Sequence, residues 1–359
     1  MQISRMVLFW CSFAIDISIC GCYGRHTFGP GQPIDASSPI DVVNPDGDVP
    51  ALLPIDFANL QWAQVHEETS VYSFHDIDCA TPNRCVVVGD DGITATSSDF
   101  GVTWTVNGAP TNQNLERLSC PSQDVCFAVG DTGAIIRSGD GGNQWELQNS
   151  GTGERLMTLS CINPQRCFAG AFNPSFKWLL ETSNGGQSWT NKSIAAYDGL
   201  GYAMDCHDEV CLLVADYASF FRSVDDGVTW TNYPDVDIPD GDVDCHGEFC
   251  VAVGYRYDDS SPLWTSVTSG LSWTASGVES TVKPRTVHCP STTTCVVPIG
   301  KNFLVTTDMG TAWNTIDIPM LEAEENPILH FRDIVCPGLQ FCIARQKNIL
   351  WRAITPADQ

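Results

Sequence analysis

The octapeptide SSDFGVTW, Ser97–Trp104, carries a serine, an aspartate, a glycine and a tryptophan at the spacing S-x-D-x-G-x-x-W. Two other segments share this spacing in full, and three more keep it with Thr in place of Ser or another residue in place of Asp. The further copies are Ser138–Trp145, Thr182–Trp189, Ser223–Trp230, Ser266–Trp273 and Thr306–Trp313. Six copies of one short pattern predict a repeat architecture.

The cysteines repeat with the same period. Of 17 cysteines, 14 form the close pairs Cys79/Cys85, Cys120/Cys126, Cys161/Cys167, Cys206/Cys211, Cys245/Cys250, Cys289/Cys295 and Cys336/Cys342. Successive pairs are 39 to 47 residues apart, which is the period of a β-propeller blade. Each pair brackets a predicted hairpin, a position that suits a disulfide. Zinc fits poorly, because it needs four converging ligands and different blades hold the pairs apart.

One repeat shows the four strands of a blade. Residues 117–120 (RLSC) read as the inner strand and residues 126–130 (CFAVG) as an apolar second strand. The turn DTG leads to a third strand at 134–138 (AIIRS), and the box pattern forms the turn before an outer strand that starts at Trp145. The fold class is therefore all-β: a β-propeller of four-stranded blades.

Seven cysteine pairs but six box patterns leave the last blade one strand short. The segment 59–65 (NLQWAQV) can supply this strand, because Trp62 precedes Cys79 by 17 residues, as a box tryptophan would. We expect this segment to pair with the strand around 349–353 and close a seven-bladed ring, which removes the free sheet edges. The predicted propeller spans 57–355, and 356–359 form a tail.

The N-terminus has the features of an export signal. Arg5 precedes the apolar run Met6–Ile15, which is too short for a typical membrane span. The sequence ICGC that ends at Cys22 resembles a bacterial lipobox, so we predict a lipoprotein signal over 1–21 with Cys22 lipidated; an ordinary signal peptide cleaved nearby is the alternative. Residues 22–56 are rich in Pro, Gly and Asp and predict a flexible tether. The expected location is the cell surface, outer membrane or periplasm.

The box pattern resembles the Asp box, or BNR repeat, in which Ser and Asp cap the turn, Gly permits a close or left-handed backbone, and Trp packs between blades. The resemblance implies that Asp99, Asp140, Asp225 and Asp308 are structural. A seven-bladed ring of such repeats resembles photosystem II assembly factors of the Ycf48 type, which dock partners through a basic surface. This chain has a net charge of −25 and 18 Lys and Arg without an arginine run, so that docking role does not transfer.

Composition and resemblance together predict a non-enzymatic binding or scaffold propeller, monomeric, that recognises a protein or a glycan at the cell envelope. A nucleic-acid partner is disfavoured because phosphate binding needs clustered cations. The alternative is a glycoside hydrolase, since sialidases and xyloglucanases carry similar boxes. The sialidase type needs a six-bladed ring with three convergent arginines, and the xyloglucanase type needs two propellers facing across a cleft. We therefore predict no catalytic residues.

Length variation between repeats indicates where a ligand would bind. The third and fifth repeats have additions between their second and third strands, at 172–178 and 255–264. Variable loops on a rigid scaffold commonly carry function. Their side chains suit stacking on a sugar or a peptide, although they could equally pack under their own loops. The candidate ligand-binding residues are Phe176, Trp178, Tyr255, Arg256, Tyr257 and Trp264.

No resident cofactor is predicted, but two features could hold a metal. The acidic segment 235–244 contains Asp235, Asp237, Asp240 and Asp242, weak candidates for calcium because EF-hand spacing is missing. The segments DCHDEVC and DCHGEFC place His207 and His246 at matching positions of neighbouring blades, with Glu209 and Glu248 close by in sequence. These residues could hold a transition metal or simply be exposed turn residues.

Overall fold

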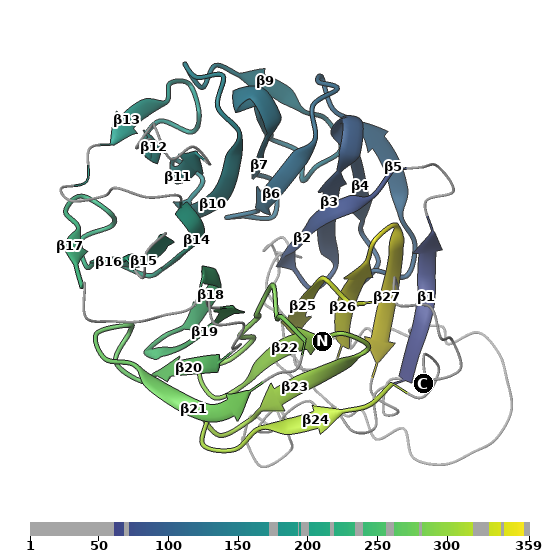
Figure 1. Ribbon diagram of the computed structural model, residues 1–359. Helices are drawn as coiled ribbons and strands as arrows, with labels where there is room; N and C mark the ends of the chain where they lie inside the picture. The colour runs from purple at the N-terminus through teal and green to yellow at the C-terminus, as the bar shows by residue number, and fades with distance from the viewer. Residues whose placement is uncertain are drawn as a thin grey trace, which may run out of the picture. The chain divides into compact units, whose positions relative to one another are not determined.

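The chain folds as a seven-bladed β-propeller in which seven antiparallel sheets surround a central axis (Figure 1). The computed structural model describes residues 61–67, 72–171, 179–192, 194, 201–215, 219–233, 240–255, 262–279, 282–318, 330–338 and 341–354. The predicted signal, Cys22 and most of the tether lie outside these residues. No helix in the described part of the chain is long and apolar enough to span a membrane.

The strands follow the predicted order from the inside of each blade to the outside. Blades 1 to 3 comprise β2 (Phe74–Thr81), β3 (Arg84–Gly89), β4 (Ile93–Ser97) and β5 (Thr105–Gly108); β6 (Leu115–Ser119), β7 (Cys126–Gly130), β8 (Ile135–Ser138) and β9 (Glu146–Gln148); β10 (Leu156–Asn163), β11 (Arg166–Ala171), β12 (Leu179–Thr182) and β13 (Thr190–Lys192). Blades 4 and 5 comprise β14 (Gly201–His207), β15 (Val210–Ala215), β16 (Ser219–Ser223) and β17 (Thr231–Asn232); β18 (Asp240–His246), β19 (Phe249–Tyr255), β20 (Pro262–Ser266) and β21 (Thr274–Glu279). Blades 6 and 7 comprise β22 (Cys295–Ile299), β23 (Asn302–Thr306) and β24 (Asn314–Ile316); β25 (Asp333–Gly338), β26 (Phe341–Gln346), β27 (Ile349–Ile354) and β1 (Gln61–Glu67).

Burial explains why the second strands are continuous apolar runs. Every residue of β7 is buried, because both faces of the sheet are covered by neighbouring blades. The apolar clusters lie between blades: Phe127 of blade 2, for example, packs with Leu159 and Trp189 of blade 3. Outer strands such as β9 are largely exposed. Packing between blades therefore stabilises the ring.

Blade 6 departs from the regular pattern at its inner strand. Residues 282–287 form no ladder, and the only described pairing is a single bridge between His288 and Val296. Pro284 contributes to this irregularity, because proline has no N–H for a ladder hydrogen bond. The segment therefore follows the channel wall without a regular strand ladder, while Val287 packs with Val297 and Leu304 of its own blade.

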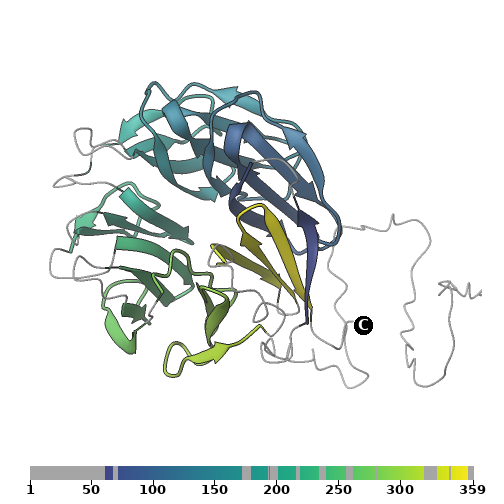
Figure 2. The same ribbon diagram turned by 45° about the vertical axis from the view of Figure 1, so that its right-hand side comes forward.

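The N-terminal strand closes the ring as predicted. Strand β1 pairs antiparallel with β27 from Gln61–Ile354 to Glu67–Ile349, and Figure 2 shows the first strand beside the last blade. Trp62 is 8% exposed and stacks on Phe303 of blade 6 with ring centroids 5.1 Å apart. The closing strand therefore also seals the junction between blades 6 and 7.

The seven cysteine pairs form the predicted disulfides, each within the hairpin between the first two strands of a blade. In blades 1 to 6 the Cα atoms of each pair are 4.0 Å apart, and in blade 7 they are 4.1 Å apart. Short cross-links of this kind hold one hairpin rather than distant elements, so they stabilise each blade locally. The bridges are Cys79–Cys85, Cys120–Cys126, Cys161–Cys167, Cys206–Cys211, Cys245–Cys250, Cys289–Cys295 and Cys336–Cys342.

The second cysteine of each pair lies deeper than a place in a hairpin turn suggests. It occupies the start of the apolar second strand and is at most 1% exposed in every blade. Cys85, Cys167, Cys250 and Cys342 are 0% exposed and belong to the apolar clusters between blades. These cysteines are therefore core residues and not part of a binding surface, because the packed sheets leave their sulfur atoms no access to a ligand.

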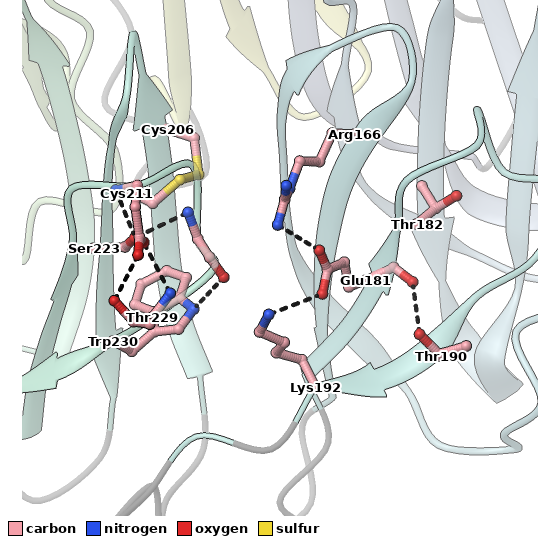
Figure 3. Close-up of polar contacts among 12 residues, drawn as sticks. Arg166, Glu181, Thr182, Thr190, Lys192, Cys206, Cys211, Ser223, Thr229 and Trp230 are labelled. Carbon is pink, nitrogen blue, oxygen red and sulfur yellow. Dashed lines mark hydrogen bonds and ion pairs between the residues drawn. A yellow bond between two sulfur atoms is a disulfide. The ribbon is translucent and has the colours of Figure 1, made fainter.

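The six box turns share one set of hydrogen bonds. In blade 4 the Ser223 hydroxyl accepts from the backbone N–H of Gly227 (2.9 Å), and Asp225 Oδ1 accepts from that of Thr229 (2.8 Å). Figure 3 shows this turn beside the Cys206–Cys211 disulfide. Thr268 makes the equivalent bond to Ser272 with a hydroxyl (3.0 Å), so the role survives loss of the carboxylate. The predicted capping role of these residues agrees with the structure.

The box glycine contacts the preceding blade. Gly227 has φ +73°, and a Cβ at this position would collide with the ring of Phe168 in β11. In blade 3, beside this junction, Glu181 lies between Arg166 (2.6 Å) and Lys192 (3.2 Å), as Figure 3 shows. The glycine is needed both for its backbone conformation and for the close approach of two blades.

Backbone hydrogen bonds place the box turns and the disulfide hairpins on one face of the ring. Gly141 donates to the carbonyl of Asp124 (2.7 Å) in blade 2, and Asp226 donates to that of Glu209 (3.1 Å) in blade 4. We call this face the box face. The turns between second and third strands and the connections between blades lie on the opposite face, which we call the loop face.

Truncation of Trp62 should weaken ring closure. Trp62→Ala removes a buried aromatic side chain between two blades, and we expect the free energy of unfolding to fall by about 3 kcal/mol. Urea denaturation measures this change. Leu147→Ala, on the outer strand of blade 2, is the control, since Leu147 is 58% exposed.

Deletion of 23–50 should leave the unfolding transition unchanged, whereas deletion through residue 66 should abolish it. A normal unfolding transition for the longer deletion would contradict the ring closure.

Candidate functional site

The inner strands enclose a central channel of about 980 Å³. They all run in the same direction, so residues at their beginnings lie toward the loop face and their cysteine hairpins lie toward the box face. Among the described residues, the channel wall contains as many cationic as anionic side chains. The cations are Arg117, Arg155, Lys283, Arg285, Arg332, Arg345 and Lys347, and the carboxylates are Asp76, Asp78, Glu116, Asp205, Asp242, Asp244 and Asp333.

The carboxylates nearest the box face join successive blades. The residue before the first cysteine of a blade accepts a hydrogen bond from the backbone N–H of the first cysteine of the next blade. The bonds run from Cys120 to Asp78 (2.6 Å), from Cys245 to Asp205 (3.0 Å) and from Cys289 to Asp244 (2.6 Å). The hydroxyl of Ser160 does the same for Cys206 (3.0 Å). These side chains satisfy the inner sheet edges, which would otherwise lack partners.

A second tier lies two residues closer to the loop face. Its carboxylates accept from the backbone N–H groups of the next blade in the same way: Leu118 to Asp76 (2.6 Å), Val287 to Asp242 (3.1 Å) and Ile77 to Asp333 (3.2 Å). A sequence signal for both tiers exists, namely Asp one or three residues before the first cysteine. A comparison of cysteines and boxes alone does not reveal it, so the tiers were not predicted.

Burial disfavours the ionised form of these carboxyl groups. It raises the pKa of Asp78 and of Asp242 from the ordinary 3.8 to about 6, although backbone N–H donors oppose the shift in both. Burial also raises the pKa of Asp76, which faces Asp333, and that of Asp205, which faces Asp244, well above the ordinary value. Part of the channel wall is therefore neutral near pH 6, which limits repulsion between carboxylates.

Glu116 behaves differently from the aspartates. Burial opposes its ionisation, but hydrogen bonds from His75 and Arg155 outweigh burial and lower its pKa to about 2. Arg155 Nη2 lies 2.6 Å from Glu116, and Arg155 Nε lies 2.9 Å from Asp131. This cluster holds one cation, Arg155, between two carboxylates at the loop-face end of the channel.

The other cations at the loop-face end form a crescent on blades 6 and 7. Lys283 and Arg285 belong to the segment of blade 6 that has no strand assignment, Arg332 precedes β25, and Lys347 follows β26. All four are exposed, and no carboxylate of the described residues forms an ion pair with Arg285, Arg332 or Lys347. We call these four residues the cationic crescent.

A side cavity of about 120 Å³ adjoins the cationic crescent between blades 6 and 7. Lys283, Arg285 and Arg332 line both this cavity and the channel, and His330 and Gly300 contribute to its wall. Although the 18 Lys and Arg include no arginine run in the sequence, the fold brings seven of them to one channel.

The structure places few of the predicted ligand-binding residues. Phe176, Trp178, Arg256 and Tyr257 lie outside the described residues. Tyr255 is the last residue of β19, and Trp264 lies in β20, opposite Ala252. Trp264 is partly buried against the cluster between blades 4 and 5, so it belongs to a strand and not to the predicted loop.

The acidic segment proposed for calcium is only partly described. Asp235 and Asp237 lie outside the described residues, Asp240 begins β18, and Asp242 belongs to the channel wall. The described residues contain no group of three or more His, Cys, Asp or Glu side chains with the geometry of a metal site.

The channel combines features of a binding site with groups that could transfer protons. Asp76 and Asp333 share a hydrogen bond, and such carboxyl pairs can act as acid and base. Both, however, accept backbone N–H groups of the next blade, which is a structural duty. The exposed guanidinium groups of the crescent suit carboxylate binding, so anion binding is the chemistry this end of the channel is best equipped for.

Comparison with known proteins adds information on the fold alone. No family model matches the sequence, and no curated protein matches it. Among solved structures, the chain is similar to YCF48 bound to a D1 peptide (TM-score 0.64, 13% identity, 85% of this chain and 98% of that chain). It is also similar to the RRP9 WD40 repeats (0.63, 10%, 84% and 98%) and to a GH74 xyloglucanase from Xanthomonas campestris (0.56, 12%, 83% and 54%).

Protonation of Asp242 should make the protein more stable in acid. Its folded pKa of about 6 exceeds the ordinary value, so its stabilising contribution is complete below about pH 4 and is lost as the pH rises through 6. Asp242→Asn is neutral at every pH and can still accept the Val287 N–H. Relative to the natural chain, we expect this variant to gain about 2 kcal/mol in unfolding free energy between pH 4 and pH 8.

Urea denaturation at several pH values tests this expectation. Asp225→Asn is the control, because turn hydrogen bonds lower the pKa of Asp225 to about 2. The stability that ionised Asp225 contributes is therefore present above the ordinary pKa and is lost only in strong acid. That variant should lose stability at pH 8. An Asp242→Asn variant that parallels the natural chain at all pH values would contradict a raised pKa.

Proposed function

We propose that this chain is an exported, lipid-anchored, non-enzymatic propeller that binds a protein partner by an acidic segment at the loop-face end of the channel. The observation that carries the proposal is the cationic crescent, formed by Lys283, Arg285, Arg332 and Lys347 in a protein with a net charge of −25. Cations concentrated at one opening of a strongly acidic protein favour local attraction of an anionic group.

The surroundings of the crescent support a peptide-sized ligand. The channel and the side cavity share three cations, so an acidic segment could contact the crescent along more than one residue. Arginine is well suited to this role, because its guanidinium group binds carboxylates with two parallel hydrogen bonds. A solved neighbour of the same fold, YCF48, carries a D1 peptide, which makes a peptide ligand a reasonable choice for this chain.

The loops predicted to carry stacking residues remain part of the proposal. We expect Phe176, Trp178, Arg256 and Tyr257, which lie outside the described residues, to extend the binding surface around the channel opening, together with Tyr255 at the end of β19. A glycan in place of a protein would stack on the same aromatic side chains, and its binding would not depend on the cationic crescent.

A glycoside hydrolase is the second candidate function. It is favoured by the likeness to a xyloglucanase and by the Asp76–Asp333 carboxyl pair in the channel. Release of reducing sugar from xyloglucan or from sialylated glycans by the natural chain, abolished in Asp333→Asn, would establish this alternative and overturn the non-enzymatic proposal.

Charge reversal at the crescent tests the binding site. Arg285→Glu and Arg332→Glu should each weaken binding of a labelled Glu/Asp-rich dodecapeptide by at least ~tenfold, because they replace attraction with repulsion at close range. Fluorescence anisotropy measures the affinity. Lys192→Glu, on the outer strand β13 of blade 3, makes a comparable charge change away from the channel and should have little effect.

Two results would overturn this site. One is equal affinity for the acidic peptide and for its Gln/Asn counterpart in the natural chain. The other is an equal loss of affinity in all three charge-reversal variants, which would indicate attraction to the surface in general. Preferential binding of glycans over acidic peptides, insensitive to Arg285→Glu, would move the site to the aromatic loops.

Lipidation of Cys22 tests the proposed location. In a bacterial host, the natural chain should incorporate labelled palmitate and sediment with membranes, whereas Cys22→Ser should do neither. Cys20→Ser is the control, because the lipobox resemblance places the modification at the following cysteine. An unlabelled mature protein with a new N-terminus near residue 22 would support the ordinary signal peptide.

A further inference from the structure

Two histidines lie side by side on the box face, opposite the cationic crescent. His207 ends β14 of blade 4 and His246 ends β18 of blade 5, each directly after the first cysteine of its blade. Their ring centroids are 5.2 Å apart, and the ring planes are inclined by 33°. The other five blades have Ala80, Pro121, Ile162, Pro290 and Pro337 at the matching position.

The hairpins that carry these histidines are unlike those of the other blades. Their cysteines are separated by 5 residues instead of 6, so His207 pairs with Val210 and His246 with Phe249 across two-residue loops. The first residue of each loop, Asp208 or Gly247, adopts a positive φ. The two hairpins with the shortest cysteine spacing are therefore the two that carry the histidines, and they are neighbours.

Both hairpins are held firmly. Each is closed by a disulfide directly beside the histidine, and each accepts a backbone hydrogen bond from its own box turn: Asp226 to Glu209 (3.1 Å) and Ser269 to Glu248 (2.9 Å). A site built on rigid elements keeps its geometry when a ligand binds, which lowers the entropic penalty of binding.

The distance between the rings suits one shared metal ion. Metal–nitrogen bonds of about 2.0–2.1 Å bring the centroids of two imidazole ligands to roughly 4.5–5 Å from each other, from the right angle of a tetragonal copper(II) site to the tetrahedral angle of zinc. The observed separation of 5.2 Å is of this size. Imidazole nitrogen is a preferred ligand of copper, zinc and nickel, and copper(II) binds most tightly of the three.

Neighbouring groups orient the rings in the way metal-binding histidines require. His246 forms a hydrogen bond with the backbone of Cys289 in blade 6. His207 Nε2 lies 3.4 Å from Asp208 Oδ2. Each ring thus contacts a neighbouring group, and contacts of this kind help to fix the orientation of metal-binding histidines.

We propose that His207 and His246 together bind one late transition-metal ion, with copper(II) as the preferred species, on the box face between blades 4 and 5. Water completes the coordination, since no third metal-binding side chain of the described residues has suitable geometry. The site is independent of the cationic crescent, which lies on the other face.

Copper titration of the full chain tests this proposal. The three cysteines outside the disulfides, Cys11, Cys20 and Cys22, are first blocked with iodoacetamide so that free thiols do not compete. Isothermal titration should detect one copper(II) ion per chain, and pulsed electron paramagnetic resonance should detect two imidazole nitrogens. His207→Ala and His246→Ala should each weaken binding by at least ~tenfold and leave one nitrogen.

His330→Ala, on the loop face, is the matched control and should bind copper as the natural chain does. If circular dichroism shows that an alanine variant has not folded, His207→Gln or His246→Gln replaces it. The double variant should lose both imidazole nitrogens from the resonance spectrum, because both side chains hold the same ion. Unchanged affinity in both single variants, two equivalent ions per chain, or an equal loss in His330→Ala would overturn the proposal.

Discussion

Each blade is apolar on both faces, so no blade can be stable without a neighbour on either side. Burial of Phe127, Phe168 and Phe249 between successive sheets accounts for much of the favourable free energy of folding. Every blade has a neighbour on both faces only if the last blade packs against the first. For this reason Trp62, 291 residues before its strand partner Ala353, is as important for the fold as any residue in a central strand.

The same packing creates a problem at the centre of the ring. The inner edges of the sheets would present N–H groups to the channel, and a short side chain from the preceding blade satisfies them. Asp76, Asp78 and Asp244 do this with carboxylates, which concentrates negative charge in a buried place. The raised pKa values are the consequence, and Arg117, whose own pKa is raised by the facing carboxylates despite burial, offsets part of the repulsion. Protonation of some carboxyl groups and the attraction of others to Arg117 therefore allow these carboxylates to stay buried at the centre of the ring.

The two faces of the ring have different freedom to acquire function. On the box face, disulfides and box turns hold the hairpins, so a new property has to come from single residues on a rigid frame, as with His207 and His246. On the loop face, the inner segment of blade 6 that carries Lys283 and Arg285 forms no regular strand ladder. There a new property can come from an irregular segment and from the connections between blades.

Local sequence patterns were enough to predict the repeat, the number of blades, the disulfide pairing and the closing strand. These features depend on motifs such as S-x-D-x-G-x-x-W and on a constant spacing of cysteines, and local hydrogen bonds and short hairpins reproduce them in the structure. The place where charge accumulates could not be predicted in this way. Arg155, Lys283 and Arg332 are far apart along the chain and carry no shared motif, and only the parallel alignment of inner strands around one axis brings them to a common opening. The pairing of His207 with His246 was visible as matching positions, but the 5.2 Å between their rings depends on the angle between two neighbouring blades, which packing between sheets sets and sequence spacing does not.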